Sequence, residues 1–176
     1  MTSLKPIQDE QTVTVTGDYV RKMIDGVDIR RAKTIPDDRG SICEIFNPAW
    51  GFGPDYPLVY VYQVTVRPGK IKGWVVHYTY DDRLFHSQGD VRWVMYDARE
   101  DSPTYQMVNE VYLTEYDRSL ITIPRGVVHA VQNIGHETAL FVSMPTKPYD
   151  HANPDKHRIP IGSDEIPYQF EDKPGW

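Results

Sequence analysis

Residues 124–133 read Pro-Arg-Gly-Val-Val-His-Ala-Val-Gln-Asn, and this stretch decides the fold. The segment before it, residues 119–123, is Ser-Leu-Ile-Thr-Ile, whose alternation predicts a β-strand. Proline and glycine at 124 and 126 predict a tight turn, and the valine-rich run that follows predicts a second strand. In a small β-barrel this turn would close a hairpin, and His129 would point into the lumen.

The pattern Pro-x-Gly-x-x-His-x-x-x-Asn resembles the second signature of the cupin superfamily at every fixed position. The resemblance implies an all-β fold, a cupin-type antiparallel β-barrel or jelly roll with short peripheral helices. The lumen of such a fold handles metals, sugars and nucleotide sugars. The alternative for His129 is a solvated histidine on an ordinary hairpin.

The rest of the chain supports an all-β domain, because short alternating segments recur between turn residues. We expect an N-terminal arm over residues 1–25, with a short helical turn at 19–24, and a single cupin domain over residues 26–176. The proline-rich tail after Pro145 should pack along the outside. The expected strands cover residues 27–30, 41–46, 58–66, 71–80, 91–97, 108–114, 120–123, 130–132 and 138–144.

Composition narrows the class of protein. A formal net charge of -6 gives no general attraction to nucleic acid, so that partner is not expected. No apolar run approaches the length of a membrane span, and residues 1–6, Met-Thr-Ser-Leu-Lys-Pro, lack the apolar core that a signal peptide is expected to have. The single cysteine, Cys43, excludes an intrachain disulfide and fits a reducing cytoplasm. We therefore expect a cytoplasmic protein with a small-molecule partner and no membrane.

Three polar residues could meet in the lumen. The first cupin signature pairs two histidines with a carboxylate and a later glycine, and here His77, Asp82 and Gly89 match while Val75 stands at the first histidine. Two imidazoles and a carboxylate can bind a divalent transition metal with open positions. His77, Asp82 and His129 are therefore an alternative metal site. The same residues could instead form an acid/base pair or line a pocket as satisfied polar groups.

A second resemblance covers residues from about 26 to about 170. Residues 37–40 read Asp-Asp-Arg-Gly and are followed by Glu44 and Phe46, which resembles the Asp-x-Arg-Gly…Glu-x-Phe stretch of the dTDP-4-dehydrorhamnose 3,5-epimerase family. Lys-Gly-Trp at 72–74 falls where that family has Arg-Gly-Leu, and Ser-Pro-Thr-Tyr at 102–105 resembles its Ser-Pro-Thr-Phe turn. Further matches in the same order are residues 89–97, Arg99, 123–129, Tyr149 and 163–164.

The resemblance implies epimerisation of a 4-keto sugar nucleotide or related ketosugar without a cofactor. In that family a histidine assisted by a carboxylate removes a proton next to the 4-keto group, a lysine stabilises the enolate, and a tyrosine reprotonates from the other side. These positions fall on Val75 for the base, about Asp82 for the lysine and about Ser143 for the tyrosine. His77 could be a displaced base, Lys72 or Arg83 could supply charge, and a tyrosine at 62, 78 or 80 could donate the proton.

The candidate site residues follow from both resemblances. The catalytic candidates are His77, His129, Lys72 and Asp164; the substrate-binding candidates are Arg39, Glu44, Phe46, Arg83, Ser143 and Tyr149. Arg39 suits a diphosphate because its guanidinium is a permanently charged fork. In the family, Arg39 and Glu44 match positions that reach a nucleotide across a dimer interface, so a homodimer is expected. The other interpretations are a surface ion pair for Arg39 and a turn or cap for Asp164.

Three functions remain open from the sequence. The first is an isomerase of the nucleotide-sugar epimerase kind. The second is a metal-dependent cupin enzyme, an oxygenase or a lyase, that uses His77, Asp82 and His129. The third is a binding protein that retains the sugar-nucleotide pocket without catalysis.

Overall fold

The computed structural model describes residues 5–17, 19–51 and 57–170. In this part of the chain the regular structure is almost entirely antiparallel β, with one short 3₁₀ helix, η1 (Pro48–Trp50). The cupin-type all-β fold is confirmed, and η1 is the only peripheral helix among the described residues. The helical turn expected at 19–24 is wrong, because Tyr19 instead forms an isolated β-bridge with Val13.

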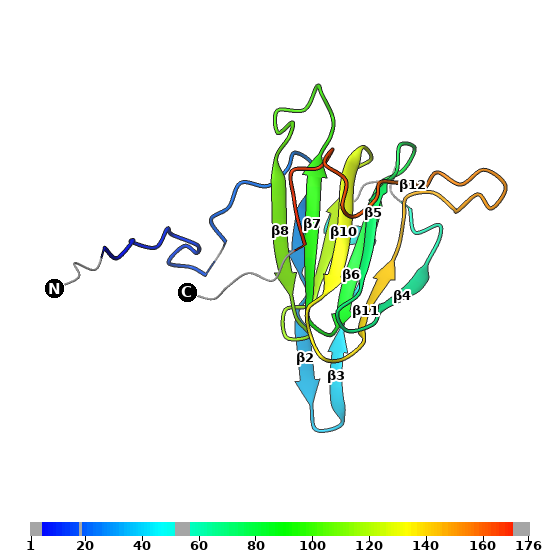
Figure 1. The fold of residues 1–176 in the computed structure, drawn as a ribbon. Helices are drawn as coiled ribbons and strands as arrows, with labels where there is room; N and C mark the ends of the chain where they lie inside the picture. Colours follow the sequence, from blue (N-terminus) through cyan, green and yellow to red (C-terminus); the bar gives the residue numbers. More distant parts are fainter. Residues whose placement is uncertain (1–4, 18, 52–56, 171–176) are drawn as a thin grey trace.

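Two five-stranded antiparallel sheets pack face to face as a jelly roll (Figure 1). The first sheet has the order β1 (Asp28–Arg31), β9 (Ser119–Ile123), β6 (Asp82–Gln88), β11 (Ala139–Ser143), β4 (Tyr62–Val66). The second has the order β12 (His157–Arg158), β5 (Ile71–Val76), β10 (Val127–Asn133), β7 (Val91–Asp97), β8 (Val108–Leu113). Most consecutive strands from β4 to β12 cross from one sheet to the other, so residues close in sequence face each other across the core.

The turn at 124–126 connects the two sheets. The hairpin expected there is wrong: β9 pairs with β1 and β6, whereas β10 pairs with β5 and β7. Gly126 has φ +82, and a Cβ there would lie 2.8 Å from Arg99 Cγ, so the turn requires glycine. This crossover delivers His129 to the face of the second sheet that looks toward the first.

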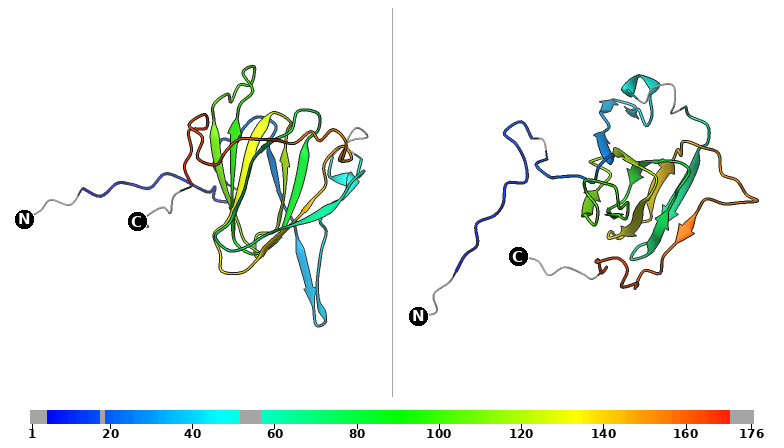
Figure 2. Two further views of the ribbon diagram at one scale, coloured as in Figure 1. Left: turned by 45° about the vertical axis from the view of Figure 1, so that its right-hand side comes forward. Right: turned by 90° about the horizontal axis from the view of Figure 1, so that it is seen from above.

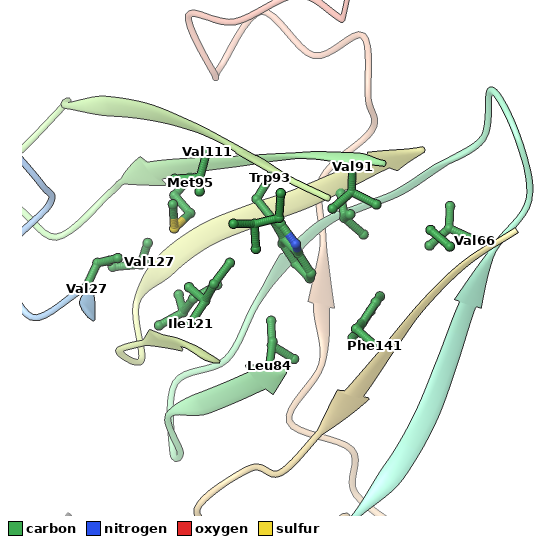
Figure 3. Packing of buried hydrophobic residues seen from close by; sticks show 14 of the residues in the cluster. Val27, Val66, Leu84, Val91, Trp93, Met95, Val111, Ile121, Val127 and Phe141 are labelled. Carbon is green, nitrogen blue, oxygen red and sulfur yellow. The ribbon is translucent and has the colours of Figure 1, made fainter. Parts of the chain in front are cut away.

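The core between the sheets explains why the strands alternate (Figure 3). Trp93 and Phe141 of the facing sheet pack as a T-shaped pair, with ring centroids 5.0 Å apart. Around this pair lie Val66, Leu84, Val91, Met95, Val111, Ile121 and Val127. Apolar side chains fill this end of the interior, and polar side chains occupy the other.

Two further segments cover the outer faces. The tail after Pro145 brings Ile159, Ile166 and Tyr168 against Trp74 on the outside of the second sheet, as expected from the sequence. Phe46 and Trp50 pack against Phe85 on the outside of the first sheet. No helix in the described ranges is long and apolar enough to cross a membrane.

Two parts of the chain stand clear of the sheets. The hairpin of β2 (Thr34–Asp37) and β3 (Gly40–Cys43) projects beyond the end of the sandwich, and residues 5–17 extend sideways as an arm (Figures 1 and 2). Ile35 and Ile42, paired across the hairpin, are 60% and 69% exposed. The hairpin thus presents apolar surface that the described part of this chain leaves uncovered.

Candidate active site

A cavity of about 420 Å³ opens between the two sheets at the edge formed by β4, β5 and β12. Val75 and His129 are paired partners on β5 and β10, so their side chains share the inner face of the second sheet. His77 follows β5, which ends at Val76 rather than continuing to residue 80 as expected. His77 and His129 therefore converge in one cavity, and their ring centroids lie 5.8 Å apart.

Asp82, the first residue of β6, faces both histidines from the opposite sheet. One carboxylate oxygen, Oδ2, lies 3.3 Å from Nε2 of His77 and 3.3 Å from Nε2 of His129. All three side chains are buried. We refer to His77, Asp82 and His129 as the His-Asp-His cluster.

Backbone carbonyls orient both imidazoles. Nδ1 of His77 donates to the carbonyl of Asp155, and Nδ1 of His129 donates to the carbonyl of Val127 over 3.2 Å. A neutral imidazole carries one proton, so both Nε2 atoms then hold a lone pair toward Asp82. Such a nitrogen can accept a proton or bind a cation.

The turn at residues 124–126 and the tail after Pro145 both form hydrogen bonds with the chain around His77. The amide of Gly126 donates to the carbonyl of His77 over 2.7 Å. The carboxylate of Asp155 accepts hydrogen bonds from the amides of Tyr78 and Thr79, at 3.0 and 2.7 Å. The Tyr80 ring stacks on His77 with centroids 4.4 Å apart. His77 is thereby held in one orientation.

The cluster shifts the protonation of its own members. Burial alone would lower the pKa of His77, but the hydrogen bond and the charge of Asp82 outweigh it and raise that pKa above 6.5. Burial alone would raise the pKa of Asp82, yet the two histidines hold it well below its ordinary 3.8. Asp82 is therefore ionised, and a proton on His77 is stabilised.

Three cations border the cavity: Lys72, Lys156 and Arg158. Lys72 pairs with Val131 on β10 and lies on the inner face. Arg158 on β12 pairs with Val75, and Lys156 lies two residues earlier on the same face. Partial desolvation and the nearby charge of Arg158 lower the pKa of Lys156. The sequence analysis missed Lys156 and Arg158 as site residues, because β12 has only two residues and no periodic signal.

The remaining sequence candidates lie outside this cavity. Arg83 alternates with Asp82 and points to the outer face, where its Nε donates to the carbonyl of Met144 over 2.8 Å and its guanidinium covers the Phe46 ring. Asp164 is exposed in the tail, and Tyr149 borders a different cavity. Ser143 is buried in β11 next to Tyr62, which does line the cavity.

Arg39 and Glu44, the residues predicted to bind a nucleotide, lie on or next to the projecting hairpin and do not line this cavity within the chain. Arg39 is 83% exposed at the tip and pairs with Asp37, Nη2 to Oδ2, at 2.7 Å. Glu44 is exposed just after β3. Their role in binding a nucleotide stays a prediction.

A jelly roll whose interior ends in a buried His-Asp-His cluster, with three cations bordering the cavity, is the architecture of the cupin type. The model of the dTDP-4-dehydrorhamnose 3,5-epimerase family matches residues 21–162, and the chain belongs to that family. The resemblance seen in the sequence is thus confirmed, and the chain is classed with the isomerases.

Two curated relatives are similar over most of their length. A probable low-salt glycan biosynthesis epimerase of Haloferax volcanii is 32% identical over 138 residues, which cover 78% of this chain and 88% of that protein. The spore coat polysaccharide biosynthesis protein SpsL of Bacillus subtilis is 31% identical over 153 residues, with 84% and 97% covered.

Solved structures share the fold. A dTDP sugar isomerase from Desulfovibrio desulfuricans superposes with a TM-score of 0.74 at 23% identity, covering 83% of this chain and 91% of that one. The 3'-monoepimerase ChmJ of Streptomyces bikiniensis, a double mutant in complex with dTDP, superposes with a TM-score of 0.75 at 18% identity, covering 86% and 77%.

Proposed function

We propose that this protein epimerises a 4-keto sugar nucleotide at a carbon next to the keto group. The observation that carries the proposal is the buried His-Asp-His cluster at the base of a cavity bordered by three cations. A base of suitable pKa and a positive environment for an oxyanion are what formation of an enolate requires. The family and the dTDP complex of ChmJ point to a dTDP-linked sugar.

In the proposed reaction Nε2 of His77 removes the proton from the carbon beside the ketone. The electron pair of the broken C–H bond moves into the enolate, whose oxygen gains negative charge. Asp82 stabilises the imidazolium that forms, while Lys72, Lys156 and Arg158 provide positive charge for the enolate and the diphosphate. His129 borders the same cavity, with its Nε2 atom 3.3 Å from the same Asp82 oxygen. Asp164, expected as a catalytic residue, is not needed in this scheme.

The test is exchange of substrate hydrogen with solvent. Incubation with dTDP-4-dehydrorhamnose in deuterium oxide is expected to place deuterium at C3 or C5, as measured by NMR or mass spectrometry. The variant His77→Asn should lose exchange by about 10²–10⁴-fold, the usual contribution of a general base. A folded wild-type protein that binds the sugar nucleotide without exchanging any hydrogen would refute the epimerase and leave a binding protein.

A second candidate, a metal-dependent reaction, is favoured by one specific observation. Both Nδ1 atoms are engaged by carbonyls, both Nε2 atoms and Asp82 Oδ2 point at one another, and Oδ1 of Asp82 is buried without a hydrogen-bond partner in the described part of the chain. Metal-binding histidines are typically oriented in this way. His77, Asp82 and His129 would hold a divalent transition metal, which supplies Lewis-acid polarisation of a carbonyl when bound.

Elemental analysis separates the two candidates. Wild-type protein purified without chelator and a His129→Asn variant are compared for bound iron, zinc, manganese and nickel. One metal per chain in the wild type, lost in the variant, would favour the second candidate. Full exchange activity in metal-free protein would favour the first.

We further propose that the protein acts as a homodimer in which the projecting hairpin serves the site of the other copy. Its exposed Ile35 and Ile42, with Arg39 at the tip, support this arrangement. Light scattering should give twice the chain mass of 20.4 kDa. Mixing the variants Arg39→Ala and His77→Asn should restore part of the activity that each lacks. A cytoplasmic location stays a prediction.

A further inference from the structure

Tyr62 lies where a proton donor opposite the His-Asp-His cluster would be needed. It is the first residue of β4, at the edge of the first sheet, and it borders the same cavity as His77 and His129. Those histidines belong to the second sheet or its edge. Tyr62 and the histidines therefore face the cavity from opposite walls.

The strand register connects Tyr62 to the position where the family resemblance expects a tyrosine. That position falls on Ser143 of β11, and Ser143 is the direct cross-strand partner of Tyr62. Paired side chains of antiparallel strands point to the same face, with Cβ atoms about 4.5–5.5 Å apart. A phenol on either strand can therefore enter the same part of the cavity, and the small, buried serine leaves that space to Tyr62.

The other nearby tyrosines have different surroundings. Tyr80 stacks on the His77 ring, and its hydroxyl lies 3.5 Å from His77 Nε2, so it adjoins the base instead of facing it. Tyr149 lies beside His151 at a separate cavity. Of the tyrosines in the described ranges, Tyr62 is the one that lines the cavity of the cluster.

The environment keeps the Tyr62 phenol protonated. Burial, and to a smaller degree the charge of Asp82, raise the pKa of Tyr62 above its ordinary 10, against a weaker opposing effect of the Ser143 hydroxyl. A neutral phenol can donate a proton to carbon, whereas a phenolate cannot.

We propose that Tyr62 reprotonates the enolate from the face opposite His77, which is the step that inverts the carbon. The inference rests on the proposed epimerase function. His77 Nε2 takes the proton from one face, the enolate forms, and a C–H bond forms on the other face as the Tyr62 O–H bond breaks. His77 is then protonated and Tyr62 is a phenolate, and proton transfer through water restores both.

The test separates proton removal from inversion. In deuterium oxide the variant Tyr62→Phe keeps the base, so deuterium should still enter recovered dTDP-4-dehydrorhamnose at a rate within about fivefold of wild type. Formation of the epimer should fall by about 10²–10⁴-fold, the usual contribution of a general acid. The matched control Tyr80→Phe should retain more than a tenth of the wild-type ratio of inversion to exchange.

A strand swap provides an independent measurement. The double variant Tyr62→Ala/Ser143→Tyr moves the phenol to the neighbouring strand, and it should form epimer at least tenfold faster than Tyr62→Ala. A folded double variant that forms epimer no faster than Tyr62→Ala would contradict the claim that a phenol at position 143 enters the same part of the cavity as Tyr62.

The outcomes distinguish this inference from the function on which it rests. Wild-type protein that exchanges and inverts, together with a Tyr62→Phe variant whose ratio of inversion to exchange is unchanged, would overturn the role of Tyr62 alone. Wild-type protein with neither exchange nor inversion would overturn both proposals.

Discussion

Replacing Asp82 by asparagine should make the protein more stable and nearly inactive. Asp82 is 4% exposed and ionised, and one of its oxygens has no partner among the described residues. Its other oxygen faces two imidazole nitrogens that hold lone pairs when the histidines are neutral. A carboxylate has no proton to donate to either, so the wild-type arrangement becomes electrostatically unfavourable as pH rises above the raised pKa of His77.

The magnitude follows from the geometry. An asparagine amide has two N–H donors, and the nitrogens of His77 and His129 lie 3.3 Å from the position that the amide nitrogen would occupy. Two new hydrogen bonds contribute about 1–3 kcal/mol in total. For a chain of this size that is a rise in Tm of about 2–12 °C. Exchange activity should fall by about 10²–10⁴-fold, because the imidazolium of His77 loses its counter-ion.

The gain in stability from Asp82→Asn should increase as pH rises from the acidic to the alkaline side of neutrality. The pKa of His77 is raised, so its contribution through the ion pair with Asp82 is fully present below 6.5 and is lost as pH rises through the higher folded pKa. The pKa of Asp82 is lowered, so its contribution is present above 3.8 and is lost as pH falls. Wild type is therefore best stabilised between about pH 4 and pH 6.5, and the advantage of Asp82→Asn should be largest near pH 8.

Calorimetry at about pH 5.5 and pH 8 measures this difference. The neighbouring Asp81→Asn variant is the control, because Asp81 accepts a hydrogen bond from the amide of Arg125 at 2.9 Å, which an asparagine oxygen can also accept, and among the described residues its ion-pair partner is Arg125 and not a histidine. That control should change stability by at most about 1 kcal/mol. An Asp82→Asn variant destabilised by more than about 1 kcal/mol at pH 8 would refute the assignment of lone pairs to both Nε2 atoms.

Three further predictions concern other parts of the molecule. Asp97→Asn should destabilise the protein by about 3–5 kcal/mol in urea unfolding, because Asp97 is fully buried and accepts hydrogen bonds from Arg99, Ser102 and Thr104. These partners outweigh the effect of burial and keep the pKa of Asp97 low. The stabilisation that Asp97 provides is therefore lost as pH falls below 3.8. Lys156→Met or Arg158→Met should each weaken dTDP binding about tenfold in calorimetric titration at low salt, with Lys70→Met as a surface control; equal affinity would show that the cations do not bind the diphosphate. Gly73→Ala should cost at least about 2 kcal/mol, since Gly73 has φ +137 and a Cβ there would lie 2.4 Å from Ala130 Cβ.

Local patterns were sufficient to predict most of the strands and the convergence of the two histidines, but not β2, β6 or β12. Alternation placed most strands, and the shared face of Val75 and His77 put His77 toward the interior. What local patterns could not supply is which strands pair. The turn at 124–126 has the composition of a hairpin turn, yet it crosses between sheets because β10 finds its partners in β5 and β7.

The site residues that the sequence did not indicate were missed for the same reason, because their position depends on which strands pair. Lys156 and Arg158 enter the cavity because β12 adds to the edge of β5, and a two-residue strand in a proline-rich tail carries no periodic signal. Tyr62 was one of three tyrosines of equal standing in the sequence. Only the register with Ser143 and the position of β4 across from β5 distinguish it.

At each of the three positions where the chain departs from the family pattern, another residue brings the missing chemical group to the same cavity. Valine replaces the expected base at 75, but His77 lies two residues further on the same face. Asp82 replaces the expected lysine, but Lys156 and Arg158 reach the cavity from the tail. Serine replaces the expected tyrosine at 143, but Tyr62 stands opposite it. A protein that only binds a sugar nucleotide needs cations for the diphosphate, but it needs neither a base nor a proton donor in the cavity. Their joint presence around one space favours a rearranged catalyst over a binding protein.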